Sequence, residues 1–232
     1  MKNFLIAALA ATVSFASPLV AQDNPVVVEL YTSQGCSSCP PADAILHQLA
    51  DREDVIALAL HVDYWDYIGW KDPFADPAHA ERQRAYARVG QRRTIYTPEM
   101  VVQGVTDIVG ARPMKLSEAI AKHARMAPKV DLDIKRDGNT LVVEAKALEQ
   151  LSGRMTVHLL SYAPEHTTKI KRGENRGKTL SYANVVEDWK VIGDWDGSGP
   201  LNISAEMTDD LPSVVLIQEQ DAGPILAAAR LR

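Results

Sequence analysis

Apolar residues in the first half of the chain follow two alternating patterns. Residues 26–31 and 55–62 are almost continuously apolar, which is typical of strands whose two faces are both covered by helices. Between them, from Ala42 to Leu49, apolar residues recur at spacings of three and four, which predicts one buried face of a helix. The chain is therefore expected to begin its fold as strand, helix, strand.

The segments that follow continue this alternation. A second helix is predicted to begin at Pro77 with Asp76 as its N-cap, because proline is favoured at the first helical position and aspartate just before it. Short strands are predicted near 100–102 and 108–109, and a last helix is predicted to begin at Pro113. The resulting order, β-α-β-α-β-β-α, predicts an α/β fold in which helices pack against a central sheet.

Beyond Pro128 the pattern changes to strict alternation of apolar and polar residues. Alternating runs on both sides of Asp137-Gly138 predict a β-hairpin. Apolar or alternating runs at 155–159, 214–217 and 225–231 predict further short strands, so the second half is expected to be a smaller all-β, sandwich-like domain. The expected organisation is a signal peptide at 1–21, an α/β domain at 25–128 and a β-sandwich-like domain at 129–232.

The first residues have the pattern of a signal peptide. Lys2 precedes an apolar run, residues 4–13, that is too short to span a bilayer, and small residues follow it. Cleavage after Ala21 fits this pattern, cleavage after Ala16 competes with it, and an uncleaved anchor is the alternative. After cleavage we expect no stable membrane insertion, and we expect a periplasmic or secreted protein.

The net charge of the chain argues against one class of partner. The chain has 25 basic and 30 acidic residues, a formal net charge of −5, which argues against nucleic acid as a partner because such binding needs a basic patch. The densest basic patch, from Lys169 to Arg172, is expected to be a solvated loop, as is the stretch from Arg172 to Arg176. Residues 194–197 lack the spacing of a calcium loop and are expected to form a turn.

The two cysteines carry the main chemical signal. Cys36 and Cys39 stand between a predicted strand and a predicted helix, and in an oxidising compartment they are expected to form one disulfide. A helix N-terminus offers positive charge and free N–H donors, which stabilise the thiolate that attacks other disulfides. Cys36 is expected to attack and Cys39 to resolve the mixed disulfide, with Ser37 and Ser38 donating hydrogen bonds to sulfur.

Two alternatives remain open for this pair. One alternative is a merely stabilising disulfide, although a four-residue loop yields only about 2 kcal/mol in the chain-entropy model. Alternatively, His61 on the second strand would complete a Cys2His copper or zinc site with Cys36 and Cys39. A histidine on a strand is more often satisfied by hydrogen bonds, so we assign no metal ligand and expect no cofactor.

The strand and loop around the cysteines carry a resemblance to known proteins. Glu29-Leu-Tyr-Thr-Ser-Gln-Gly-Cys-Ser-Ser-Cys-Pro-Pro-Ala-Asp43 resembles the active-site strand and loop of glutaredoxins and thioredoxins. Together with His61-Val-Asp-Tyr-Trp-Asp66, residues 96–102 and residues 223–226, it is similar to domain-of-unknown-function family 1223, exported bacterial proteins with a thioredoxin-like domain. The resemblance implies a thioredoxin-like fold for residues 25–128 and names no reaction.

The same resemblance implies roles for residues distant from the cysteines. Thr97-Pro98 would be a cis peptide, and the backbone of Thr97 would pair with a bound substrate strand beside Cys36. The buried aspartate of thioredoxins has no exact match, and Glu29 lies one residue further from the cysteines on the corresponding strand. Glu29 would accept the proton of Cys39 if it is buried; a partly exposed Glu29 in an ion pair is the alternative.

The chain also departs from the thioredoxin pattern. Gly35 replaces the usual aromatic residue before the first cysteine, and Pro40 and Pro41 follow the second.

An aromatic cluster follows the second strand, and one member, Trp65, is a candidate for binding an extended substrate at this end of the sheet. The alternative is that these rings pack between a helix and the sheet or against the second domain. The members of the cluster are Tyr64, Trp65, Tyr67 and Trp70.

These observations favour an exported thiol–disulfide oxidoreductase. Its substrates would be exported proteins or small thiols with exchangeable disulfides, and a redox partner protein would restore its starting state. The alternative is a periplasmic copper-binding or delivery protein, or a non-catalytic partner-binding protein, that keeps the thioredoxin-like fold without turnover.

Overall fold

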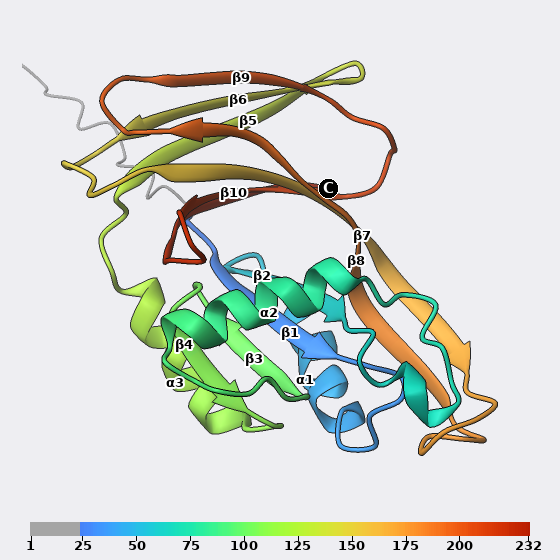
Figure 1. The fold of residues 1–232 in the computed structure, drawn as a ribbon. Helices are drawn as coiled ribbons and strands as arrows, with labels where there is room; N and C mark the ends of the chain where they lie inside the picture. Colours follow the sequence, from blue (N-terminus) through green and yellow to red (C-terminus); the bar gives the residue numbers. More distant parts are fainter. Residues whose placement is uncertain (1–23) are drawn as a thin grey trace, which may run out of the picture.

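The computed structural model describes residues 24–232 and has a mixed α/β architecture. A large mixed sheet of eight strands runs through the molecule, and a small sheet of three strands packs on one end of it (Figure 1). The expected signal peptide, residues 1–21, lies outside the described residues. Within residues 24–232, the helices are all too short or too polar to cross a bilayer.

The elements are as follows. The strands are β1 (Val26–Thr32), β2 (Val55–His61), β3 (Glu99–Val102), β4 (Thr106–Val109), β5 (Val130–Asp137), β6 (Thr140–Ala147), β7 (Met155–Lys169), β8 (Thr179–Trp195), β9 (Leu201–Glu206), β10 (Ser213–Glu219) and β11 (Ile225–Leu231). The helices are α1 (Pro40–Ala50), α2 (Pro77–Val89) and α3 (Pro113–Ala124), with a short 3-10 helix, η1 (Asp66–Ile68).

Local signals placed the helices correctly. Pro40 and Pro41 stand in the first turn of α1, and Pro77 begins α2. The side chain of Asp76 accepts a hydrogen bond from the backbone N–H of Ala78 at 2.8 Å, as an N-cap should. The predicted helix that begins at Pro113 is α3.

The large sheet has the order β11-β10-β7-β8-β2-β1-β3-β4. Strand β1 pairs with β2 in parallel and with β3 in antiparallel orientation. Buried side chains of α1 and α3 share one apolar core with β1 and β2, whereas those of α2 belong to the core on the opposite face (Figure 1). Both faces of β1 and β2 are therefore covered, which explains their continuous apolar sequences.

The second half of the chain forms two layers. Strands β5, β6 and β9 make the small sheet, and a third apolar core lies between it and the strands β7, β10 and β11 of the large sheet (Figure 1). The long strands β7 and β8 continue past this core, and β8 pairs with β2 in parallel orientation where Val185 lies opposite Ala59. One sheet therefore serves both halves of the chain, on either side of the expected boundary near Pro128.

The sequence patterns missed β8 and β9. Residues of β8 alternate irregularly, partly because its register with β7 shifts and partly because Asn184 adopts a positive φ of 49°. The expected turn at 194–197 is wrong at its start, because Asp194 and Trp195 still belong to β8. The expected loop at 172–176 is confirmed and forms the tip between β7 and β8.

Candidate redox site

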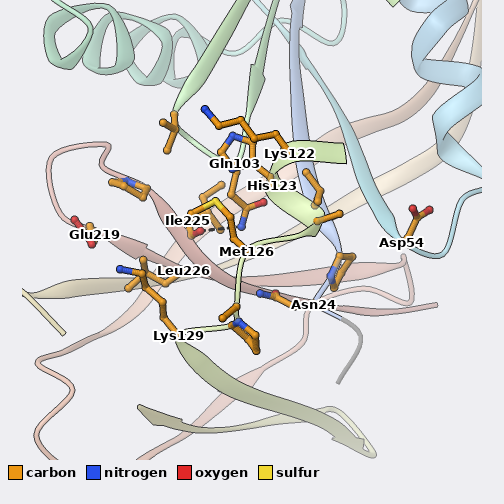
Figure 2. A pocket seen from close by; sticks show the side chains of 17 residues that line it. Asn24, Asp54, Gln103, Lys122, His123, Met126, Lys129, Glu219, Ile225 and Leu226 are labelled. Atoms are coloured by element: carbon orange, nitrogen blue, oxygen red, sulfur yellow. Dashed lines mark hydrogen bonds between the residues drawn. The ribbon is translucent and has the colours of Figure 1, made fainter. Parts of the chain in front are cut away.

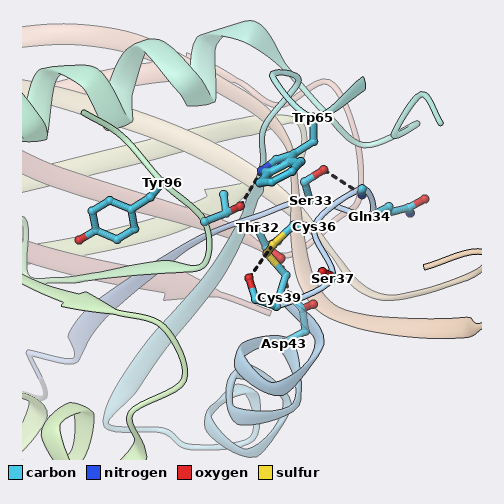
Figure 3. The surroundings of a disulfide bond; sticks show 12 residues. Thr32, Ser33, Gln34, Cys36, Ser37, Cys39, Asp43, Trp65 and Tyr96 are labelled. Atoms are coloured by element: carbon cyan, nitrogen blue, oxygen red, sulfur yellow. Dashed lines mark hydrogen bonds between the residues drawn. A yellow bond between two sulfur atoms is a disulfide. The ribbon is translucent and has the colours of Figure 1, made fainter. Parts of the chain in front are cut away.

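Cys36 and Cys39 form a disulfide at the end of β1, and their Cα atoms are 5.4 Å apart (Figure 3). Cys39 is the N-cap of α1, so the predicted position of the pair at the start of a helix is confirmed. The strand that precedes it is buried along its whole length, and it therefore fixes the loop against the sheet. The site is built by one strand end and one helix start.

The helix start offers fewer free donors than expected. Pro40 and Pro41 have no N–H group, and the N–H groups of Ala42 and Asp43 both donate to the carbonyl of Cys39, at 2.8 and 3.1 Å. The first turn therefore has few N–H groups left to stabilise a thiolate. The helix dipole remains available to do so.

The two serines between the cysteines lie at the surface. Ser37 and Ser38 are exposed, and the hydroxyl oxygen of Ser38 lies 3.3 Å from the Sγ atom of Cys36. This is the kind of hydroxyl contact expected from the sequence. The cysteines themselves are buried, with exposed fractions of 1% for Cys36 and 0% for Cys39.

Trp65 lies beside the disulfide loop (Figure 3). The indole N–H of Trp65 donates to the Oγ1 atom of Thr97 at 2.7 Å. Trp65 also packs on Gly35, where a Cβ atom would lie only 2.9 Å from the Cβ of Trp65. The glycine that replaces the usual aromatic residue thus leaves room for Trp65, and the Thr97-Pro98 peptide is cis, as the resemblance implied.

The tip of the β7–β8 hairpin, taken from here on as residues 169–178 and so including the last residue of β7, also contacts the disulfide loop. Asn175 is fully buried, and its side-chain amide donates to the carbonyl oxygens of Gln34 and Cys36, both at 2.9 Å. The carboxylate of Glu174 accepts a hydrogen bond from the backbone N–H of Ser37 at 3.2 Å. No sequence signal pointed to this contact, because it joins segments that are far apart along the chain.

Asp43 is the acidic side chain beneath the disulfide (Figure 3). It lies in the first turn of α1, it is 6% exposed, and its carboxylate accepts a hydrogen bond from the hydroxyl of Thr32 at 2.7 Å. Burial raises the pKa of Asp43 to about 6, against the opposing influence of His61 and of the Thr32 hydrogen bond. Its spacing of four residues from Cys39, on one helix face, was the sequence signal available for it.

His61 is buried beside Asp72. Its Nδ1 atom lies 2.7 Å from a carboxylate oxygen of Asp72, and both side chains are fully buried. Edge-on contacts with Phe74 and Tyr182 hold the ring, with centroids 5.4 and 4.7 Å away. Across residues 24–232, no three His, Cys, Asp or Glu side chains gather in an arrangement that would hold a metal ion.

Glu29 lies on the face of β1 that α2 covers. The guanidinium of Arg82 donates to its carboxylate at 2.6 Å, and Glu29 is fully buried. The same guanidinium donates to the hydroxyl of Tyr86 at 2.7 Å and stacks on the ring of Trp189, 4.1 Å from its centroid. Of the two roles considered for Glu29, the structure shows the ion pair. Glu29 is buried in this pair, whereas the expected pair was partly exposed.

The other aromatic residues of the cluster after β2 mostly form contacts within the fold. The hydroxyl of Tyr64 donates to Gln83 of α2 at 3.1 Å, and the indole N–H of Trp70 donates to Gln34 at 2.8 Å. Tyr67 is the exception, because it is 81% exposed and stacks on Trp65 with centroids 6.4 Å apart.

A cavity of about 530 Å³ lies at the opposite end of β1 (Figure 2). Its lining includes Asn24 before β1, His123 and Met126 at the end of α3, and Ile225 at the start of β11. The disulfide follows the other end of β1, so this cavity takes no part in the redox site.

Fold and site together define a mixed α/β protein with a CxxC disulfide at the start of a helix. The chain belongs to the family described as protein of unknown function DUF1223, which matches residues 27–218. A crystal structure of an Agrobacterium tumefaciens protein is similar, with 30% identity, a TM-score of 0.77, and coverage of 89% of this chain and 93% of that one. HBP35 of Porphyromonas gingivalis shares the fold at 15% identity and a TM-score of 0.61, over 90% of this chain and 74% of that one. No curated protein is significantly similar in sequence.

Proposed function

We propose that this protein is an exported thiol–disulfide oxidoreductase whose redox centre is the Cys36–Cys39 disulfide. The observation that carries the proposal is the position of this disulfide, directly between a buried central strand and the helix that Cys39 caps. A CxxC pair in a βαβ context is typical of thioredoxin-like redox proteins, and a disulfide spanning one turn contributes little stability. We assign the thioredoxin-like domain to the segment from β1 to α3.

The exchange uses both sulfurs and conserves electrons. A thiolate of a client attacks the Sγ atom of Cys36, and the Cys36–Cys39 bond breaks with its electron pair passing to Cys39. A second client thiolate then attacks the client sulfur of the mixed disulfide and releases Cys36. The client loses two electrons and gains a disulfide, the protein gains two electrons and becomes a dithiol, and the reverse reaction uses the same atoms.

Asp43 is the proton donor and acceptor for Cys39 in this proposal. It lies one helical turn beyond Cys39 and hydrogen-bonds Thr32 at the end of β1. With its pKa raised to about 6 by burial, the carboxyl group exchanges a proton near neutral pH, which matches the need of a thiolate leaving group. Glu29 is held by Arg82 on the other face of the sheet, and we assign it a structural role.

Access to Cys36 requires local opening. Because Cys36 is 1% exposed, an attacking sulfur reaches it only after Trp65 or the hairpin tip moves aside. Such openings of surface loops cost less free energy than global unfolding. The backbone of Thr97 would then pair with the extended client, with Pro98 and Trp65 beside it, and Ser37 and Ser38 would line its path.

The test is to trap the intermediate. Cys39→Ala removes the resolving thiol, so Cys36 should accumulate as mixed disulfides with exported proteins or small thiols, visible as reducible adducts by mass spectrometry of the exported protein. The double variant Cys36→Ala/Cys39→Ala is the control and should carry none. The proposal fails if the single variant has no more adducts than the double variant.

A further inference from the structure

The hairpin tip is a strongly basic segment of an acidic chain. Residues 169–178 contain five basic side chains and one acidic side chain, whereas the whole chain has a formal net charge of −5. All five basic residues are exposed, and within residues 24–232 none of them forms an ion pair. They are Lys169, Lys171, Arg172, Arg176 and Lys178.

This charge is fixed beside the redox disulfide. The two hydrogen bonds from Asn175 to the carbonyls of Gln34 and Cys36 tie the tip to the loop that holds the disulfide. The ammonium group of Lys178 donates to the Oδ1 atom of Asn175 at 2.9 Å, so one basic side chain also holds the anchor in place. The other basic residues therefore belong to a segment that is anchored to the CxxC loop through Glu174 and Asn175.

Glu174 offsets one of the five positive charges, which leaves the tip with a formal net charge of +4. Glu174 accepts a hydrogen bond from Ser37. On the adjoining segment, Asp66 accepts one from the backbone N–H of Asp72 at 3.1 Å, and Asp72 accepts one from the backbone N–H of Gln34 at 2.8 Å. These three carboxylates hold the loops together, and the five exposed basic residues of the tip outnumber them.

We propose that the tip, residues 169–178, is a recognition surface for acidic polypeptide segments, and that it selects clients whose exchangeable cysteine lies next to aspartate or glutamate. The inference rests on the proposed function and names its substrate class. Complementary charge raises association rates and suppresses partners of like charge. The positive field would also favour the thiolate of Cys36, which receives few N–H donors from the proline-rich helix start.

The experiment compares three disulfide-containing peptides that differ only in the residues flanking cysteine: glutamate, serine or lysine. For the full-length mature protein at low ionic strength, exchange with the glutamate peptide should be at least about tenfold faster than with the lysine peptide, and salt should reduce the difference. Lys171→Glu/Arg172→Glu should abolish or invert this preference, measured as the ratio of the glutamate-peptide rate to the lysine-peptide rate in the same protein. Lys115→Glu/Lys122→Glu on α3 changes net charge equally and should retain the preference.

A binding measurement separates this inference from the proposed function. Fluorescence anisotropy with glutamate and lysine peptides that carry serine in place of cysteine reports charge recognition without exchange. If no peptide exchanges but the glutamate peptide binds more tightly and the tip variant removes that preference, the oxidoreductase proposal fails and the recognition surface stands. Equal binding of the two peptides by the wild-type protein, or an unchanged preference in the tip variant, would overturn the recognition surface.

Discussion

The side-chain amide of Asn175 lies 2.9 Å from the carbonyl oxygen of Cys36, although 139 residues separate them in the sequence. Asn175 comes from the tip between β7 and β8, in the second half of the chain, and Cys36 from the loop after β1. A segment of the β-rich half thus holds down the backbone of the disulfide loop. The second half of the chain thus contributes to the candidate redox site, because it contacts the backbone of the disulfide loop.

Asn175→Ala should accelerate reduction of the disulfide. The variant loses two buried hydrogen bonds of about 1 kcal/mol each, so the population with the tip detached should rise by roughly ten- to thirtyfold. The measurement is the rate of reduction by dithiothreitol under native conditions, followed by thiol labelling. Asn202→Ala, at an exposed position of β9, is the control and should leave the rate unchanged. An unchanged rate in Asn175→Ala would mean that the tip does not limit access.

Asp43→Asn should change how stability depends on pH. The carboxyl group has a pKa of about 6 in the folded protein against 3.8 as the ordinary value, so the folded state holds its proton more tightly than the unfolded state. Stability associated with this group is therefore complete below about pH 4 and is lost as pH rises to about 6 and above, by about 3 kcal/mol in total. The variant should not show this loss.

The measurement is the free energy of unfolding in urea between pH 4 and pH 8 for wild type, Asp43→Asn and the exposed control Asp51→Asn. Asp51→Asn should follow the wild-type curve, because Asp51 lies at the solvent-exposed end of α1. In the same samples, the rate of thiol–disulfide exchange should lose its dependence on a group titrating near pH 6 only in Asp43→Asn. Parallel curves for all three proteins would contradict the assignment of the raised pKa to Asp43.

Glu29→Gln should destabilise the fold without altering the pH dependence of exchange. It leaves the guanidinium of Arg82 largely buried and without its carboxylate partner, which typically costs about 3–5 kcal/mol. Glu81→Gln breaks the exposed pair with Arg84 and should cost no more than about 1 kcal/mol, as surface pairs usually do. Urea unfolding gives both values. A change in the pH–rate profile of Glu29→Gln would instead support a proton-transfer role for Glu29.

Gly35→Ala should disturb the contact between Trp65 and the disulfide loop. The added Cβ would lie 2.9 Å from the Cβ and 3.3 Å from the carbonyl oxygen of Trp65, so the loop carrying Trp65 must shift at a cost of about 1–3 kcal/mol. Thermal unfolding and tryptophan fluorescence report the loss of stability and the movement of the ring. Gly199→Ala adds a methyl group where no atom lies within 4 Å, and its melting curve should match that of the wild type.

The sequence determined the local parts of this protein. Apolar periodicity and the prolines at helix starts fixed α1, α2 and α3, and the same reasoning placed Cys36 and Cys39 between a strand and a helix. These features depend on residues within one or two helical turns of one another, so a reader of the chain can recover them. The β5–β6 hairpin followed from its turn for the same reason.

Only the tertiary structure decided what surrounds the disulfide. The pairing of β8 with β2, the hydrogen bonds of Asn175 and the ion pair between Glu29 and Arg82 all join segments at least 50 residues apart. Contacts of this kind arise from how strands are ordered in the sheet, and no periodicity along the chain encodes that order. The sequence therefore supplied the CxxC motif, whereas the contacts around it, the burial of Asp43 and the position of the basic tip became visible only once the chain was folded.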